Sequence, residues 1–277
     1  MPRRMALTGH PHTYALEVRT TLDLPLLAGD GDAEAILVEL ERVRLAFDAR
    51  CFAFAVAPAC LRLVLSHRAA GSDDDAGLRA RWLAAGGGDI PAERLYARLT
   101  SLSGFMQTLL QRTTRACNRR HGSRGSRWAA RYRSCLLADD TATLAAIAWA
   151  ERTAPGWALV SSRDQHETRP TPGTPVTLSA PPLVAGPDGE LLPTGDAPPG
   201  LMPPGSDERQ AWLDRFCDAL GPVAIAAYGE AIAHGWALGK PESLAECISR
   251  LGRVGGRGRS RVARDLADEL GLCGVWG

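Results

Sequence analysis

The chain has 277 residues, 45% of them hydrophobic, and a formal net charge of only +1. This length and composition allow a substantial core, in one domain with appendages or in two small domains. No run approaches 18 apolar residues, and no apolar segment follows the opening Met1-Pro-Arg-Arg, so we expect a cytoplasmic protein with no membrane partner. The seven cysteines are scattered without a CxxC pair, which argues against a disulfide framework and a structural zinc site.

The first part of the chain predicts strand, helix, strand and strand. Residues 8–21 alternate as a strand does, and His10 and His12 within them lack a third metal ligand nearby. Asp32 is expected to cap a helix that continues to Phe47. Residues 51–56 are continuously apolar, as in a buried strand, and Pro58 leads into a further strand at 61–66. Alternation places Leu61, Leu63 and Leu65 on one face of that strand and Cys60, Arg62 and Val64 on the other.

Residues 69–98 interrupt this pattern with Gly-Ser-Asp-Asp-Asp and Gly-Gly-Gly, which predicts a solvated insertion with a short helix at 78–83. The next stretch, residues 101–137, holds eight arginines and no Asp or Glu. An apolar stripe and arginines spaced three and four apart predict a helix, followed by a turn at 118–126 and a strand at 127–137. A solvated surface normally mixes charge signs, so this stretch indicates a nucleic-acid surface. Its arginines are Arg112, Arg115, Arg119, Arg120, Arg124, Arg127, Arg131 and Arg133.

A helix at 141–152 completes an order of elements typical of an α+β fold. We expect a split βαβ, ferredoxin-like antiparallel sheet with helices on one face. Residues 1–160 would form this domain, residues 161–206 a proline-rich linker, and residues 207–277 a helical C-terminal extension. The extension ends in a basic tail that includes Arg257 and Arg259, which we also expect to contact DNA.

Four local segments resemble the REP-associated tyrosine transposases, a single-tyrosine, HUH-type family. The matches are to its strand pair around Met-Pro-Asn and His-x-His, to its counterpart of this chain's Leu102-Ser-Gly-Phe-Met-Gln through Asn118-Arg-Arg-His-Gly122, to its Leu-Trp-Gln-Gly-Arg-Phe-Lys-Ser segment, and to its helix ending in Asn-Pro-Val-Arg-Ala-Gly-Leu-Val. Here they correspond to residues 51–65, 102–122, 127–134 and 144–160. The resemblance covers roughly residues 5–160 and 206–261, and its most specific part is 118–134.

The resemblance implies cleavage of single-stranded DNA beside a hairpin. In the family two histidines on one strand hold a divalent metal, Mg or Mn, and a helix tyrosine attacks the phosphate. Here the histidine positions are Cys60 and Arg62, and the tyrosine position is Trp149. A guanidinium has no acceptor and an indole offers only an N–H, so we expect neither a bound metal nor cleavage.

Each replaced position has two interpretations. Cys60 is a structural thiol or a ligand; Arg62 holds a phosphate in place of the metal or is an ordinary salt-bridged arginine; Trp149 packs in the core or stacks on a base. Tyr132 is a core aromatic residue or a relocated nucleophile. For the whole protein the preferred hypothesis is a DNA-binding protein, and the alternative is an active single-strand transposase or nickase with a substituted site. Whether the chain forms a homodimer stays open.

Overall fold

The protein is described by a computed structural model for residues 12–21, 25–29, 31–67, 75–152, 159–160, 206–234, 237–252, 263–265 and 272–275. Its first half contains the predicted strand, helix, strand, strand, helix, strand order. The elements are β1 (His12–Arg19), α1 (Asp32–Ala46), β2 (Ala49–Ala57), β3 (Cys60–His67), α4 (Leu102–His121) and β4 (Arg133–Leu137).

The strand order confirms the split βαβ, α+β fold. The sheet runs β5-β2-β3-β1-β4-β6-β8-β7, and β1 pairs antiparallel with both β3 and β4. The strands that flank helix α1, β1 and β2, are therefore parallel to each other with β3 between them. Likewise β3 and β4 are parallel with β1 between them, which is the ferredoxin-like arrangement.

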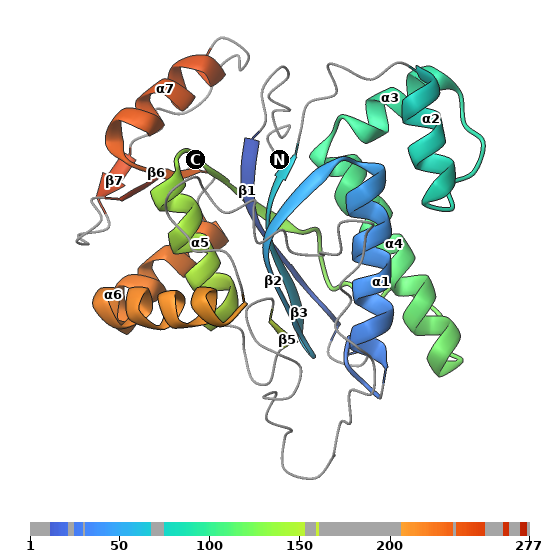
Figure 1. Ribbon diagram of the computed structural model, residues 1–277, viewed down its shortest axis with the longest axis horizontal. Helices are drawn as coiled ribbons and strands as arrows, with labels where there is room; N and C mark the ends of the chain where they lie inside the picture. The colour runs from blue at the N-terminus through green and yellow to red at the C-terminus, as the bar shows by residue number, and fades with distance from the viewer. Residues whose placement is uncertain are drawn as a thin grey trace.

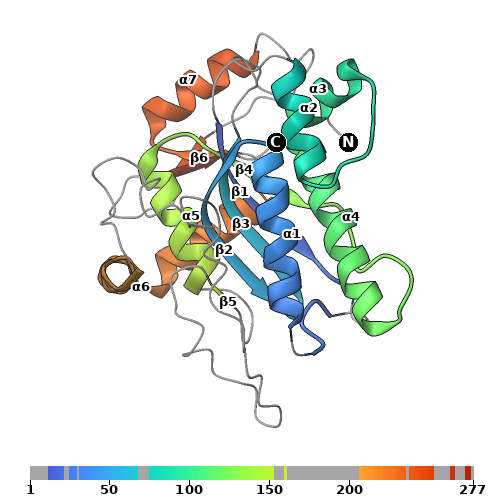
Figure 2. The same cartoon turned by 45° about the vertical axis from the view of Figure 1, so that its right-hand side comes forward.

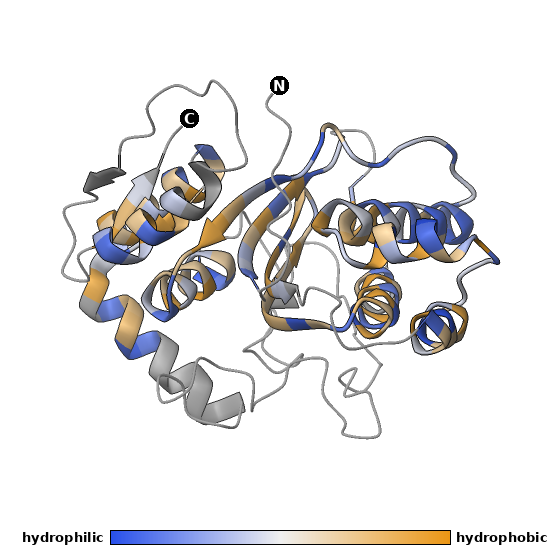
Figure 3. Ribbon diagram, turned by 90° about the horizontal axis from the view of Figure 1, so that it is seen from above, coloured by the Kyte–Doolittle hydropathy of each residue, from blue (hydrophilic) through white to orange (hydrophobic). Residues whose placement is uncertain are grey.

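Helices cover both faces of this sheet, whereas the sequence predicted helices on one face (Figure 1). On one face α1 and α4 pack over Leu16, Val18 and the leucines of β3. On the other face α5 (Asp140–Arg152) and α6 (Ser206–His234) pack over smaller residues, among them Ala15, Ala53 and Val64. The view from above shows the sheet between these two helical layers (Figure 3). The prediction was wrong because these strands are apolar on both faces, as in a sheet buried between two layers.

The insertion is more ordered than the sequence predicted. It holds two helices, α2 (Asp75–Ala84) and α3 (Ala92–Leu99), which lie next to each other beside the start of α4 (Figure 2). Leu78, Trp82, Leu95 and Leu99 are buried in the core that α1 and α4 share. Two helices joined by a short loop bury one apolar stripe each, so the segment contributes to the core although its connecting loops are glycine-rich.

The C-terminal segment extends the same sheet and core. Strand β6 (Ala237–Gly239) pairs parallel with β4, and β8 (Cys273–Val275) joins it to β7 (Ala263–Asp265). Helix α6 is kinked at Gly221, where φ is 72° and Pro222 follows. Helix α7 (Pro241–Gly252) follows β6, and the short β5 (Leu159–Val160) pairs with β2.

The remaining predictions have mixed outcomes. Strand β4 is shorter than expected, because residues 127–132 make only one bridge, Trp128 to Thr20. Asp32 is the first residue of α1 and does not cap it; its carboxylate turns back to the backbone N–H groups of Ala28 and Gly29. The proline-rich linker, apart from its last residue, and the tail with Arg257 and Arg259 lie outside the described residues. Among the helices that the structure describes, none has the length and apolar character needed to cross a bilayer.

Candidate nucleic-acid interface

The packing of α5 on the sheet brings into contact two of the three positions that the resemblance assigns to a catalytic site. Arg62 of β3 stacks over the Trp149 ring of α5, with its guanidinium carbon 4.3 Å from the ring centroid. The Arg62 Nη1 also donates to the Trp149 carbonyl at 3.3 Å. Cys60 lies two residues earlier on the same strand face, so all three positions gather on the α5 side of the sheet, although they lie up to 89 residues apart in sequence.

Arg62 is occupied by contacts within the protein. Its Nε donates to Glu17 Oε2 at 3.0 Å, and both side chains are almost completely buried. Glu17 also accepts from Arg19 Nε at 3.0 Å on its other oxygen. A buried guanidinium with a carboxylate partner and an aromatic partner has its charge balanced internally. The structure therefore supports the salt-bridged interpretation of Arg62 over the phosphate-binding one.

Cys60 is buried, and its thiol is unreactive at neutral pH. Burial raises the pKa of its thiol to about 11, although the nearby Arg62 acts in the opposite direction. The thiol is therefore protonated at neutral pH, and metal ligation by cysteine needs the thiolate. Trp149 is also buried, between the sheet and α6, which supports core packing over base stacking.

These residues do not fit the divalent metal that the family resemblance implies. A protonated thiol and a permanently charged guanidinium offer no oxygen or imidazole donor for Mg or Mn. Glu17 is the nearest carboxylate, and its two oxygens are engaged by Arg62 and Arg19. In the described part of the chain, no three His, Cys, Asp or Glu side chains gather in a way that could hold a metal ion.

Three of the eight predicted DNA-contacting arginines have partners in the protein. Arg112 donates to Glu39 at 2.8 Å and to the Ala85 carbonyl, and so ties α4 to α1 and to the insertion. Arg120 donates to the wholly buried Asp32 at 3.2 Å. Arg127 is only 2% exposed. These contacts make Arg112 and Arg127 structural residues, while Arg120 remains partly exposed.

Arg127 organises the loop that follows α4. Its guanidinium donates to the Pro25 carbonyl at 2.7 Å, to Asn118 Oδ1 at 3.0 Å and to Ser123 Oγ at 3.1 Å. Asn118 in turn donates to the Gly125 carbonyl at 2.9 Å. The segment that resembled the family most specifically therefore keeps a loop in shape. Its glycines have a structural reason, because Gly122 and Gly125 take φ values of 59° and 98°.

The other five arginines of the stretch point outward, and we call them the outward arginines. They are exposed, and none of their guanidinium groups has a partner among the described residues: Arg115, Arg119, Arg124, Arg131 and Arg133. The first two lie on α4, Arg124 lies on the loop, Arg131 lies two residues before β4, and Arg133 is the first residue of β4. The outward arginines therefore follow the chain from α4, around the loop, to the first residue of β4.

Sequence reasoning missed Glu17 and Arg19. Glu17 lies directly across from Arg62 on one side and from Arg133 on the other, so one carboxylate stands among three arginines, Arg19, Arg62 and Arg133. Arg19 pairs with Cys60 in the register and is 64% exposed. The signal in the sequence was the alternation of Ala15, Glu17 and Arg19, which puts two charges on one strand face. This corner of the sheet carries a net positive charge beside Cys60 and Arg62.

Tyr132, the alternative nucleophile, is nearly buried within the core under α4. Its hydroxyl lies 3.2 Å from Ser103 Oγ. A phosphate group must be able to reach a nucleophile, so the burial of Tyr132 supports its role as a core aromatic residue.

Comparison with models of protein families and with curated proteins finds no match to this chain.

Proposed function

We propose that this protein binds single-stranded or hairpin DNA in the cytoplasm without cleaving it. The observation that carries the proposal is the set of five outward arginines, which lack partners among the described residues, in a stretch free of Asp and Glu. Side chains that are charged, exposed and unpaired are available to phosphate oxygens, and guanidinium groups bind phosphate in a bidentate manner. The contacts of Arg112 and Arg127 hold the backbone that presents them.

The lack of cleavage rests on the contacts of the replaced positions. Arg62 is held by Glu17 and Trp149, and Cys60 is a protonated, buried thiol. Neither can hold a metal ion, and Trp149 has no hydroxyl with which to attack phosphorus. Catalytic groups act as a unit, so replacing all three removes the family's chemistry. The likeness to the transposases remains a resemblance of sequence segments and of element order.

Binding is tested with a fluorescent hairpin oligonucleotide at several salt concentrations. If the five outward arginines neutralise phosphates, the logarithm of the association constant should fall with the logarithm of salt at a slope of roughly −3 to −4 on single strands. The variant Arg131→Gln/Arg133→Gln should bind less tightly and with a shallower slope. The matched control is Arg79→Gln/Arg94→Gln, two exposed arginines of the insertion. Equal slopes for the two double variants, or no salt dependence in the wild type, would contradict the proposal.

Cleavage is tested with the same hairpin in the presence of Mn²⁺ or Mg²⁺. We expect no covalent protein–DNA adduct and no shortened strand on a denaturing gel. An adduct would support the alternative, an active transposase or nickase, and peptide mapping would then identify the nucleophile.

A further inference from the structure

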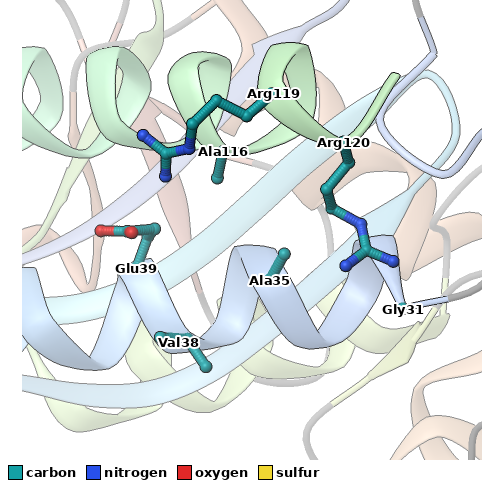
Figure 4. A pocket seen from close by; sticks show the side chains of 7 residues that line it. All are labelled: Gly31, Ala35, Val38, Glu39, Ala116, Arg119 and Arg120. Atoms are coloured by element: carbon teal, nitrogen blue, oxygen red, sulfur yellow. The ribbon is translucent and has the colours of Figure 1, made fainter. Parts of the chain in front are cut away.

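A hollow of about 430 Å³ lies between α1 and α4, on the sheet face opposite Cys60 and Arg62 (Figure 4). Its uncharged lining, which we call the floor, consists of Gly31, Ala35, Val38 and Ala116, and its charged side chains are Arg119, Arg120 and Glu39. We call it the α1–α4 groove. Its volume is within the range of sites that hold small molecules.

Arg120 is fixed at one end of the α1–α4 groove. Its Nε donates to Asp32 Oδ1 at 3.2 Å, and that carboxylate is itself held by the Ala28 and Gly29 N–H groups and by His121 Nε2. The guanidinium lies directly against Gly31, where an added Cβ would stand 2.5 Å from Nη2. Gly31 also has a φ of 74°, so the site needs glycine both for backbone conformation and for space.

Arg119 supplies a second guanidinium at the other end. In Figure 4 both arginines reach from α4 towards α1, Arg120 towards Gly31 and Arg119 towards Glu39. Among the described residues the Arg119 guanidinium has no partner, while Glu39 already accepts from Arg42 at 3.1 Å and from Arg112 at 2.8 Å. Two carboxylates, Asp32 and Glu39, therefore face four arginines. The groove also lies at the N-terminal end of α1, where the helix dipole favours an anion.

We propose that the α1–α4 groove binds a phosphorylated ligand whose phosphate oxygens are held by Arg120 at one end and by Arg119 at the other. The small floor residues let the phosphate approach α1, and the anchored Arg120 needs little reordering to receive it. A phosphorylated small molecule and the backbone of a nucleic acid present the same chemistry. The groove shares Arg119 with the outward arginines, but Arg120 and the small floor residues do not carry the proposed function, so pyrophosphate binding here does not require DNA binding.

The test uses pyrophosphate, titrated at constant ionic strength into ¹⁵N-labelled full-length protein. We expect saturable shifts of the arginine Nε–H resonances of Arg119 and Arg120. Arg119→Gln should weaken pyrophosphate binding about tenfold, since it removes one of two charged partners. The control Arg94→Gln, an exposed arginine of α3 outside the groove, should leave the affinity unchanged. Shifts that do not saturate, or equal losses in both variants, would overturn the proposal.

A second titration, with a single-stranded oligonucleotide, distinguishes the sources of the phosphate. If saturating pyrophosphate displaces the oligonucleotide, the groove holds a backbone phosphate; if both ligands bind at once, the ligand of the groove is a free phosphorylated molecule. Pyrophosphate binding in a protein that does not bind DNA would overturn the proposed function and leave this inference standing. DNA binding without saturable pyrophosphate binding would overturn this inference and leave the proposed function standing.

Discussion

At the scale of single residues, the buried Arg62 and Glu17 are the most informative pair. They lie opposite each other on neighbouring strands, 45 residues apart in the chain, and Trp149 covers the guanidinium from α5. Arg62 thus joins β1, β3 and α5 through contacts within the protein.

Removal of one member of this pair should destabilise the protein strongly. We expect Arg62→Met to lower the free energy of unfolding by about 3–5 kcal/mol, because Glu17 stays buried with one partner fewer. Adding Glu17→Gln should recover part of that loss, since the unpaired charge is then gone. Urea denaturation measures both. The control Arg79→Met breaks the exposed Arg79–Asp89 pair and should cost at most about 1 kcal/mol. Similar small losses for Arg62→Met and Arg79→Met would contradict the buried pair.

The ionisation of Cys60 and Tyr14 lowers the free energy of unfolding as the pH becomes alkaline. Burial raises the pKa of Cys60 from 9.0 to about 11 and that of Tyr14 from 10.0 to about 12. Between the unfolded and folded pKa values, only the unfolded chain has lost the proton, so stability falls as pH rises. The loss for Cys60 falls between pH 9 and pH 11, at up to about 1.4 kcal/mol per pH unit. Urea midpoints should fall less steeply over this range for Cys60→Ala, and an unchanged slope would refute this assignment.

At the scale of elements, the C-terminal end of α4 is held by its cap and by the loop behind it. Ser101 caps the other end, where its Oγ accepts from the Gly104 N–H at 3.0 Å. Gly122 ends the helix in the left-handed conformation, and its N–H donates to the Asn118 carbonyl. Asn118, Ser123 and Arg127 then fix the loop that carries Arg124. An exposed arginine on an ordered loop binds phosphate with less loss of conformational entropy.

The Gly122 cap predicts a specific cost of substitution. A Cβ at Gly122 would meet no atom within 4 Å, so Gly122→Ala should lose only the backbone energy of the left-handed conformation, about 1–2 kcal/mol. The matched control is Gly88→Ala, which is equally open in space but has no positive φ, and which should change stability by less than about 0.5 kcal/mol. Thermal or urea unfolding of the two variants compares them. Equal stabilities would show that α4 does not depend on this cap.

At the scale of the whole molecule, the two helical layers depend on segments far apart in sequence. Helix α6 covers α5, and β6 adds to β4, so the C-terminal extension buries one face of the sheet. The ion pair between Arg152 and Asp214 and the hydrogen bond from the Lys240 N–H to Asp139 at 2.6 Å join the two parts further.

A chain that ends at residue 160 should therefore not fold cooperatively. It would expose Cys135 and Leu137 of β4 and Trp149 of α5, which are buried in the complete protein. We expect strong binding of the dye ANS and poor dispersion in ¹H–¹⁵N spectra, whereas the full chain should unfold in one transition. A truncated chain with a sharp unfolding transition would instead show that the extension is separable.

The sequence by itself determined the order and type of the main elements. Hydrophobic periodicity is a local signal, so it was sufficient to place β1, α1, β3, α4 and α5, and to put Cys60 and Arg62 on one strand face. It also revealed the acid-free stretch of eight arginines. It was less successful with α2 and α3, where glycine-rich loops obscured two short amphipathic helices.

Only the tertiary structure decided which arginines are exposed and so able to bind phosphate. The partners of Arg112 and Arg127 lie at Glu39 and Pro25, 73 and 102 residues away in the chain, so local pattern could not separate them from Arg115 or Arg124. The same holds for Arg62, whose character depends on Glu17 and Trp149. Charge and spacing are properties of the sequence, whereas burial and partnership arise only when distant segments pack together.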